Sequence, residues 1–381
     1  MPGNEIIDKK ELTEITKIFT KSDGVMFAHG YDKRRNNIFR VRNFEKNLSK
    51  FFKTKYSLCV SSGTAAIKVA LKACGVKPGD EVITQAFNFI ATVEAIVDVG
   101  AKPIITNIDD TLNMCPKDLK KKISKKTKAV IPVHMLGFPA NILEIKKICK
   151  KHKIKLIEDN CESVGAKLNN KYLGTFGDVG IMSFDFGKNI TTGEGGSIIS
   201  DNKKIIKYCK EYHDHGHELN PKFPRGMDTV TNPGFNYRMT ELQAAVGIVQ
   251  LSKLPKILSE HKKRYRILLK TLSSDIETRP LINNATSSMD TLMLKINNSN
   301  IRKKIINYLR SSGIGVKNVP DAIKWHFATY WKHAISKGQL NNLSKSKAKI
   351  EKFIAIPISI RIKPADYKKV GVKINTFFSN L

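Results

Sequence analysis

The fold is decided by the stretch YSLCVSSGTAAIKVALKACG, residues 56–75. Its first five residues form an apolar run typical of a buried strand, and residues 61–66 are small residues suited to a tight turn. The amphipathic pattern that follows predicts a helix ending at Gly75. A strand, a turn of small residues and a helix in this order predict the start of an α/β fold.

The same alternation of short strands and helices continues to about residue 200. After a turn at residues 78–80, strands are predicted at 81–84, 103–107, 129–134, 155–158, 180–184 and 196–200. A helix over 141–151, with Asn141 as a plausible cap, separates two of them. Strands spaced by helices predict a mostly parallel sheet with both faces covered.

The second half of the chain starts with a long helical pattern near Met239. Thr240 and Gln243 have capping-box spacing, and the helix runs toward Pro255, where the proline is expected to break or kink it. It resumes over residues 264–272. Beyond residue 280 the pattern is a smaller α+β unit, with strands at 291–296, 316–319 and 354–360 and a helix at 301–311. The working division is an N-terminal arm (1–25), a large domain (26–255) and a small C-terminal domain (256–381).

The charge balance raises the question of a nucleic-acid partner. Basic residues number 66 against 34 acidic ones, a net charge of +32, while the hydrophobic share of 41% is ordinary for a globular chain. The basic residues are mostly lysines and occur along nearly the whole chain, without a basic tail or a nucleic-acid motif. We therefore expect no nucleic-acid partner. An acidic substrate is the better use of any local positive charge.

Cysteine usage and the chain start indicate a reducing compartment. The six cysteines form no CxxC pair, and several have apolar neighbours, as core cysteines do. Residues 1–5 contain no apolar signal region, and no run is long enough to span a membrane. We expect a soluble cytoplasmic protein with no membrane partner.

Four segments carry residues suited to chemistry. In the first, residues 61–66, amides at a helix start and the Thr64 hydroxyl would bind phosphate, although such a turn needs small residues for packing alone. In the second, Glu158 and Asp159 end an apolar strand, where ligands collect in open α/β sheets. Two solvated acids that begin a loop are the alternative there.

The third segment, residues 183–196, places Lys188 among Ser, Thr and Gly between two strands, a setting that suits a covalent bond to a carbonyl. The fourth, residues 232–245, reads Asn-Pro-Gly-Phe-Asn-Tyr-Arg-Met-Thr-Glu-Leu-Gln-Ala-Ala. By itself it could be a capped helix start.

In this order and spacing, the four segments resemble the DegT/StrS-type sugar aminotransferases, a pyridoxal-phosphate (PLP) family of the aspartate-aminotransferase fold. The resemblance is strong over residues 44–254 and weaker beyond. It implies PLP-transferase fold type I, with a mostly parallel seven-stranded sheet in the large domain and a smaller α+β C-terminal domain. It also implies a homodimer with two shared active sites.

The resemblance also implies roles for individual residues. Lys188 would bond covalently to the cofactor and then move a proton as general acid and base. Asp159 would pair with the ring nitrogen, and Phe89 would stack on the ring. Phosphate contacts fall to Ser62, Gly63, Thr64 and Ser183, with Asn236 reaching in from the partner subunit.

Departures from the family pattern bear on the chemistry. Gln85, Asn88 and Glu162 stand where relatives usually have Pro, Thr and Gln. The change at 162 leaves its contact with the 3-hydroxyl of the cofactor open. Related sugar dehydrases have His where this chain has Lys188, so transamination is favoured over removal of a hydroxyl, with glutamate as the expected donor.

The sugar is harder to assign, because resemblance within a family discriminates substrates poorly. Several features resemble the branch that makes 8-amino-3,8-dideoxy-octulosonate, an amino form of the lipopolysaccharide sugar Kdo. They are Met1-Pro2-Gly3, residues 30–36, Val133-His134-Met135, residues 213–217, Trp325-His326 and Trp331-Lys332-His333. Substrate contacts are then expected from Lys33, Arg34, Arg35, His215 and His326. A nucleotide-linked 4-keto or 3-keto hexose is the alternative substrate.

Two further interpretations are open to this sequence. A PLP-binding regulatory protein without turnover would keep the fold, but intact Lys188 and Asp159 speak against it. The alternating His213, His215 and His217 could bind a metal ion, yet no acid–His–Cys set completes a site, so no metal is expected. Packing of the small domain is the simpler interpretation of Trp331.

Overall fold

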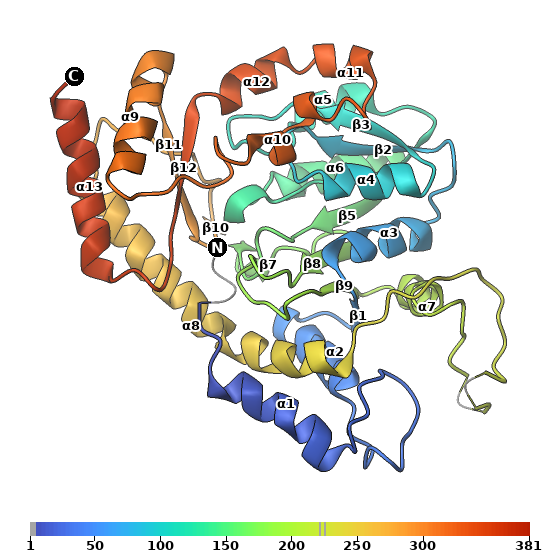
Figure 1. Ribbon diagram of the computed structural model, residues 1–381. Helices are drawn as coiled ribbons and strands as arrows, with labels where there is room; N and C mark the ends of the chain where they lie inside the picture. The colour runs from blue at the N-terminus through green and yellow to red at the C-terminus, as the bar shows by residue number, and fades with distance from the viewer. Residues whose placement is uncertain (1–4, 221, 225) are drawn as a thin grey trace.

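A seven-stranded sheet forms the centre of the computed structural model, which describes residues 5–220, 222–224 and 226–381 (Figure 1). The Met1-Pro2-Gly3 start lies outside the described residues. In sheet order the strands are β1 (Tyr56–Val60), β9 (Gly196–Ser200), β8 (Val179–Ser183), β5 (Lys155–Asp159), β4 (Thr127–Val130), β2 (Glu81–Gln85) and β3 (Lys102–Thr106). Neighbouring strands are parallel, except that β9 runs antiparallel to β1 and β8. The predicted mostly parallel seven-stranded sheet is confirmed.

Helices cover both faces of this sheet because side chains along each strand alternate in direction. Leu58 and Val60 face one core, shared with α3 (Gly63–Ala73), α4 (Ala91–Asp98) and α7 (Lys203–Tyr212). Cys59 faces the opposite core, which is formed with α2 (Arg40–Phe52) and α8 (Glu241–Thr271). Further along that second face lie α5 (Pro116–Lys122) and α6 (Ile142–His152). Strand β4 ends earlier than the predicted 129–134, since Pro132 has no N–H to donate to a sheet.

Helix α8 corrects the expectation of a break at Pro255. It runs unbroken from Glu241 to Thr271, starting from the predicted capping box of Thr240 and Gln243. Leu254 and Ile257, on either side of the proline, are fully buried in the same core. Packing of these neighbours offsets the lost backbone hydrogen bond. The predicted domain boundary at residues 255 and 256 therefore falls inside a helix.

The C-terminal unit packs α9 (Ser299–Ser311), α13 (Pro364–Ser379) and the end of α8 around a two-stranded antiparallel sheet of β11 (Thr291–Lys295) and β12 (Phe353–Pro357). The predicted strand 316–319 is wrong. Those residues run beside β12 through two backbone hydrogen bonds, from Lys317 to Ala355 and from Ala355 to Val319, and they lead into a cis peptide bond before Pro320. Two backbone hydrogen bonds are too few for a strand, and the proline that follows has no N–H to continue the pairing.

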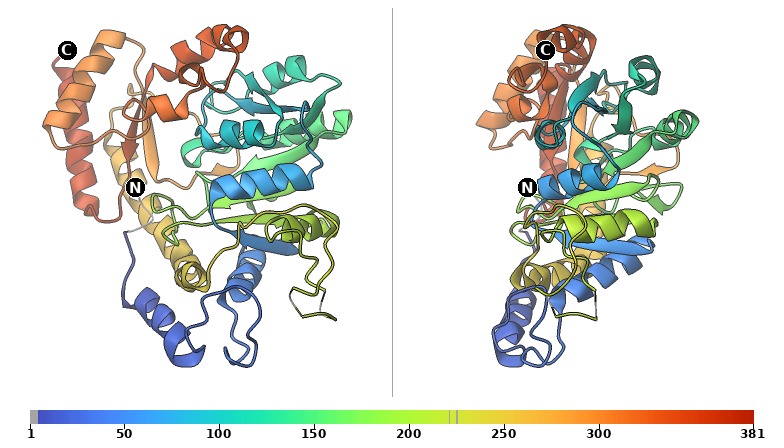
Figure 2. Two further views of the ribbon diagram at one scale, coloured as in Figure 1. Left: turned by 45° about the vertical axis from the view of Figure 1, so that its right-hand side comes forward. Right: turned by 90° about the vertical axis from the view of Figure 1, so that its right-hand side faces the viewer.

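The large sheet and the C-terminal unit meet in one apolar core. Phe87 and Met135, from the segments that follow β2 and β4, pack there with Phe327 and Trp331 from the C-terminal part. Figure 2 shows from two further sides that the C-terminal unit (orange and red) stands beside the large sheet, with α8 (yellow) running between them. Shorter elements complete the fold: α1 (Lys9–Lys21), β6 (Lys167–Leu168), β7 (Lys171–Tyr172), β10 (Ala285–Thr286), α10 (Ile323–His326), α11 (Lys337–Asn341), α12 (Ser344–Ile350) and the 3-10 turns Met135–Gly137 and Ala328–Tyr330.

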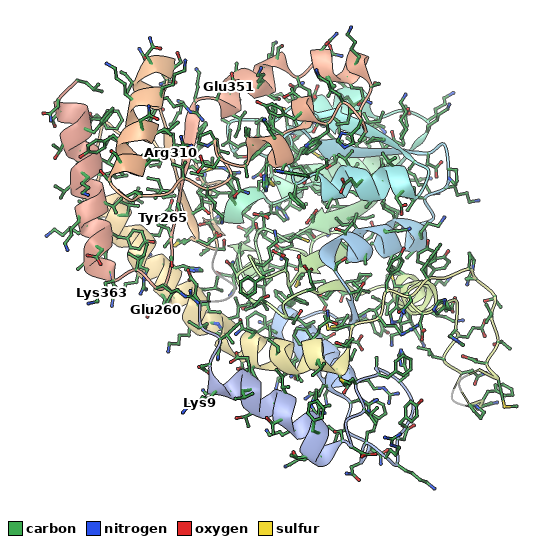
Figure 3. The ribbon with its side chains drawn as sticks, viewed as in Figure 1. Lys9, Glu260, Tyr265, Arg310, Glu351 and Lys363 are labelled. Atoms are coloured by element: carbon green, nitrogen blue, oxygen red, sulfur yellow. The ribbon has the colours of Figure 1, made fainter. Side chains whose placement is uncertain are left out.

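The high charge lies on the surface of this fold. Lys9, Glu351 and Lys363, labelled in Figure 3, are exposed, whereas Tyr265 from α8 is buried in the C-terminal core. Within the described ranges, no helix combines the length and the apolar character that a membrane span needs. The six cysteines are all free.

Candidate active site

A cavity of about 480 Å³ opens where the carboxyl ends of β5 and β8 face the C-terminal unit. Ligands bind at such strand ends in open α/β sheets. The predicted site residues that line it are Ser62, Gly63, Thr64, Phe89, Asp159, Glu162, Ser183, Lys188 and His326. Residues from all over the sequence thus meet in one place.

One end of the cavity is a set of hydrogen-bond donors at the start of α3. Ser62 caps this helix, and its hydroxyl accepts a bond from the amide of Ala65 at 3.0 Å. A Cβ on Gly63 would lie 2.8 Å from Cβ of Ser183, so only glycine lets the helix start approach β8 this closely. The first amides of α3, with the Thr64 and Ser183 hydroxyls nearby, suit a phosphate group.

Asp159 is a buried, oriented carboxylate. Its Oδ2 accepts a hydrogen bond from Thr92 Oγ1 at 2.9 Å, and its Oδ1 accepts one from the amide of Cys161 at 3.1 Å. It is 3% exposed and lines the cavity. A carboxylate held in this way can pair with a protonated ring nitrogen.

The neighbouring acid, Glu158, has a structural role. Its side chain lies 3.2 Å from His134 Nε2 and accepts backbone bonds from Gly174 at 3.0 Å and Gly177 at 2.5 Å. Successive residues of a strand point to opposite faces, which separates the two carboxylates. The interpretation of both as solvated loop acids is therefore wrong.

Lys188 forms an ion pair with Glu162 inside the cavity. Burial by itself lowers the pKa of Lys188, but the Glu162 carboxylate more than offsets it, so the pKa stands above its ordinary value. Burial likewise raises the pKa of Glu162, and the charges of Lys188, Lys317 and His326 bring it below its ordinary value. The residue that departs from the family pattern thus holds the expected catalytic lysine as an ammonium group.

The C-terminal unit forms one wall of the cavity, and two charged residues of this wall, Asp290 and Lys317, were not predicted from the sequence. Lys317 Nζ donates to Asp290 Oδ2 at 2.8 Å and to Thr291 Oγ1 at 3.1 Å, and both Lys317 and Asp290 line the cavity. Burial raises the pKa of Asp290, but Lys317 outweighs it and brings the pKa to about 2. No motif marks either residue, because the pair forms only when the residue before β11 and the segment beside β12 fold together.

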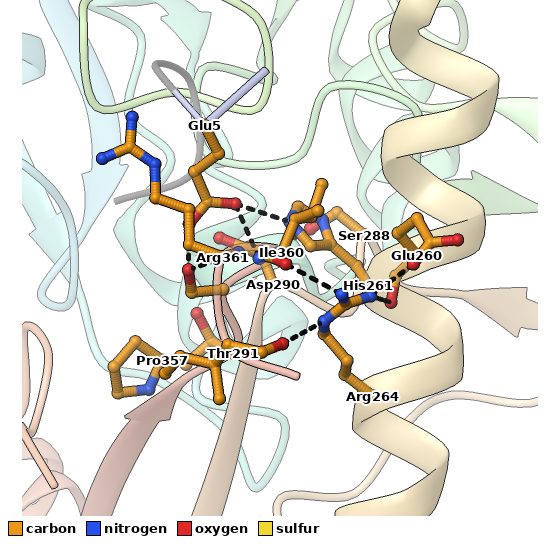
Figure 4. Close-up of polar contacts among 12 residues, drawn as sticks. Glu5, Glu260, His261, Arg264, Ser288, Asp290, Thr291, Pro357, Ile360 and Arg361 are labelled. Carbon is orange, nitrogen blue, oxygen red and sulfur yellow. Dashed lines mark hydrogen bonds and ion pairs between the residues drawn. The ribbon is translucent and has the colours of Figure 1, made fainter. Parts of the chain in front are cut away.

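Asp290 sits beside a polar cluster that anchors the C-terminal unit. Figure 4 shows Glu5 next to His261 of α8, at 3.9 Å, while its carboxylate accepts the amide of Ile360 at 2.8 Å. Ser288 Oγ donates to Asp290 Oδ1 at 2.7 Å. The N-terminal segment and α8 therefore lie beside the cavity wall.

Other predicted site residues do not line the cavity, and the prediction for one of them is wrong. Arg35 is completely buried, ion-paired with Glu241 at 2.6 Å and donating to Phe27 O at 2.8 Å, so it cannot contact a substrate. Lys33 and Arg34 are exposed, and Arg34 pairs with exposed Asp23. Their substrate role stays a prediction.

His215 and Asn236 are also exposed and do not line the cavity of their own chain. The phosphate contact predicted for Asn236 was assigned to the partner subunit, so it too stays a prediction. Among the residues that the structure describes, no group of three His, Cys, Asp or Glu is placed to hold a metal ion.

The cavity fits the cofactor that the resemblance implies. The donors at the start of α3 suit its phosphate, buried Asp159 suits its ring nitrogen, and the Lys188 amine lies in the same cavity. Phe89, whose ring lies 5.2 Å from that of His326, offers an aromatic surface beside them. Phosphate, ring and carbonyl of PLP each have a matching group.

The fold and this site define a PLP enzyme of fold type I. Over residues 35–375 the chain matches the DegT/DnrJ/EryC1/StrS aminotransferase family, and it belongs to that family. The predicted family, fold type and cofactor are confirmed.

Relatives that carry a name and solved structures of similar fold support this family assignment. GDP-perosamine synthase of Vibrio cholerae is 40% identical over 57% of this chain, which spans 58% of the length of that relative. The structure of an aminotransferase from Psychrobacter cryohalolentis has a TM-score of 0.87 and 24% identity, with 98% of each chain covered. A structure of the Escherichia coli GDP-4-keto-6-deoxy-D-mannose-3-dehydratase with bound hydrated PLP has a TM-score of 0.80 and 26% identity, covering 97% of this chain and 98% of that one.

Proposed function

We propose that this chain is a PLP-dependent aminotransferase that converts a keto-sugar into an amino-sugar, with glutamate as the amino donor. The observation that carries the proposal is the presence of Lys188 in one cavity with Asp159 and the phosphate-binding start of α3. When bound, PLP supplies a carbonyl that exchanges for an amino group and a ring that delocalises electrons.

Lys188, Asp159 and Glu162 each have a separate role in the proposed reaction. The Lys188 amine would take a proton from the substrate carbon and return it. Asp159 would keep the ring nitrogen protonated through its negative charge, since Thr92 and the Cys161 amide fix its orientation. Glu162 would steady the ammonium form of Lys188 whenever this amine is free.

A lysine at position 188 supports transamination over dehydration. A dehydratase is among the similar structures, so the fold alone does not decide between the two reactions. A histidine, which the related dehydrases have here, forms no covalent bond with the cofactor carbonyl, whereas a lysine does.

For the sugar, the names of the relatives support a nucleotide-linked 4-keto hexose better than an octulosonate. GDP-perosamine and GDP-4-keto-6-deoxy-D-mannose both carry a nucleoside diphosphate. The octulosonate substrate stays a prediction that rests on the sequence features given above. A homodimer and a cytoplasmic location are further parts of this proposal.

Absorbance of the purified protein tests the reaction. We expect a visible band from bound PLP, its loss in Lys188→Ala but not in the exposed Lys128→Ala, and a shift of the band in wild type when glutamate is added. Mass spectrometry should then detect an amino-sugar from GDP-4-keto-6-deoxymannose. Absence of any shift with amino donors would favour a regulator without turnover, and turnover of 8-keto-octulosonate alone would reverse the sugar assignment.

A further inference from the structure

Trp325 is a large aromatic side chain at the mouth of the active-site cavity that the proposed reaction does not use. It lines the cavity and is 60% exposed, whereas Trp331, the other tryptophan of the chain, is 1% exposed. Phe89, also exposed in part, is the aromatic expected to face the cofactor ring. The Trp325 indole is therefore available to another ligand.

The backbone around Trp325 is held in place from two sides. Its carbonyl accepts a hydrogen bond from the amide of Ile90 at 3.1 Å, and the His326 carbonyl accepts one from Asn88 at 3.0 Å. The buried indole of Trp331 donates to the Lys324 carbonyl at 3.0 Å. Helix α10 is thus tied to the cavity loop and to the core. The backbone that carries the exposed Trp325 indole is therefore held in place before a ligand binds, which lowers the entropic cost of binding.

The lysines that line the cavity are not available to a second anionic group. The charged residues among those lining it are Asp159, Glu162, Asp185, Glu194 and Asp290 on the acidic side, and Lys188 and Lys317 on the basic side. Both lysines already pair with one of these carboxylates. A diphosphate bound beside the cofactor would therefore meet no unpaired lysine among these lining residues, so a basic side chain near the opening would suit it better. There, exposed Lys324 precedes Trp325 on the same turn.

We propose that Trp325 stacks on the base of the nucleotide-linked sugar, with Lys324 beside it for the diphosphate. This inference rests on the proposed function and adds a residue that sets substrate specificity. An aromatic ring next to a cation recognises a base and its phosphates. Glutamate has no base, so Trp325 serves the sugar half-reaction and not the donor half-reaction.

The intrinsic fluorescence of the holoenzyme tests this contact with GDP as the probe. Only two tryptophans are present, and Trp331 is shielded, so GDP should quench the part of the emission that comes from Trp325. Trp325→Leu should lose that quenching and, by equilibrium dialysis, bind GDP roughly 5- to 150-fold more weakly. Trp325→Phe keeps a ring and should retain most of the affinity. Tyr330→Leu, which changes an exposed aromatic outside the cavity, should bind GDP like wild type.

Kinetics separate this contact from a general loss of structure. In Trp325→Leu, KM for the nucleotide-linked keto-sugar should rise by a similar factor with little change in kcat, and the glutamate-driven spectral shift should keep its wild-type rate. GDP binding by Trp325→Leu at wild-type affinity, or no quenching of wild type by GDP, would overturn the proposal. Failure of the proposed function would show separately, as a wild-type holoenzyme whose spectrum glutamate does not change.

Discussion

At the scale of single residues, the pairing of Glu162 with Lys188 distinguishes this site. A neutral glutamine, usual at this position in relatives, would leave burial as the main influence on the lysine, and burial lowers its pKa. The carboxylate reverses that direction. The carboxylate at position 162 therefore lowers the fraction of neutral amine at Lys188, the form that the proposed reaction needs, because only a neutral amine can attack a carbonyl.

We expect Glu162→Gln to make cofactor capture faster at neutral pH. Without the carboxylate the pKa of Lys188 falls, so a larger fraction of the amine is neutral at a given pH. The rate at which the apoenzyme develops its visible band with added PLP should rise in the variant, and its pH profile should shift to lower pH. Glu194→Gln, which alters a cavity acid without a contact to Lys188, is the control. An unchanged profile in Glu162→Gln would show that the ion pair does not limit capture.

At the scale of elements, contacts at the starts of helices join neighbouring parts of the fold. The Glu241 carboxylate at the start of α8 accepts the amides of Arg40 at 2.6 Å and Val41 at 3.0 Å, which begin α2, and it pairs with Arg35. Arg35, predicted to bind substrate, is instead part of this buried joint. Sequence alone could not separate Arg35 from Arg34, since burial depends on how residues 27–41 fold against α8.

Removing Arg35 should destabilise the fold. Arg35→Ala leaves the Glu241 carboxylate buried without its guanidinium partner, which costs about 3–5 kcal/mol for a buried pair. Urea unfolding followed by circular dichroism measures the loss. Arg34→Ala removes an exposed pair and should stay within about 0.5 kcal/mol of wild type. Equal effects of the two substitutions would contradict the buried joint.

The start of α3 gives a second prediction at this scale. In Gly63→Ala the new Cβ would lie 2.8 Å from Cβ of Ser183, so α3 and β8 must separate at the phosphate site. Overpacking of this kind costs about 1–3 kcal/mol, and we expect PLP affinity to fall with the stability. Gly338→Ala in α11, whose Cβ meets nothing within 4 Å, should bind PLP as wild type does. Equilibrium dialysis of PLP and urea unfolding check both effects.

Features of the fold that depend on residues close in sequence could be predicted, whereas features that depend on contacts between distant residues could not. All seven sheet strands follow from local patterns, whereas the predicted residues from Ser62 to Lys188 that line the cavity follow from the family resemblance that the four segments carry. The cavity wall of Asp290 and Lys317 does not, because these two residues are distant in sequence and meet only through tertiary packing. The continuity of α8 through Pro255 was missed for the same reason, since tertiary packing there outweighs the local preference.

At the scale of the whole molecule, the large sheet and the C-terminal unit should unfold together. Helix α8 crosses from one to the other, and Phe327, fully buried, packs with Phe87 and Met135 from the segments that follow β2 and β4. Far-ultraviolet circular dichroism reports on all elements, whereas tryptophan fluorescence reports on the C-terminal part alone, since both tryptophans lie there. In urea, the two signals should therefore give one coincident transition.

Phe327→Ala should lower the free energy of unfolding by about 3–5 kcal/mol in both signals equally. Tyr330→Ala, which removes an exposed ring nearby, should change it by less than about 1 kcal/mol. If Phe327→Ala moved the fluorescence transition to lower urea and left the circular dichroism transition in place, the two units would be independent, and the cavity between them would open without global unfolding.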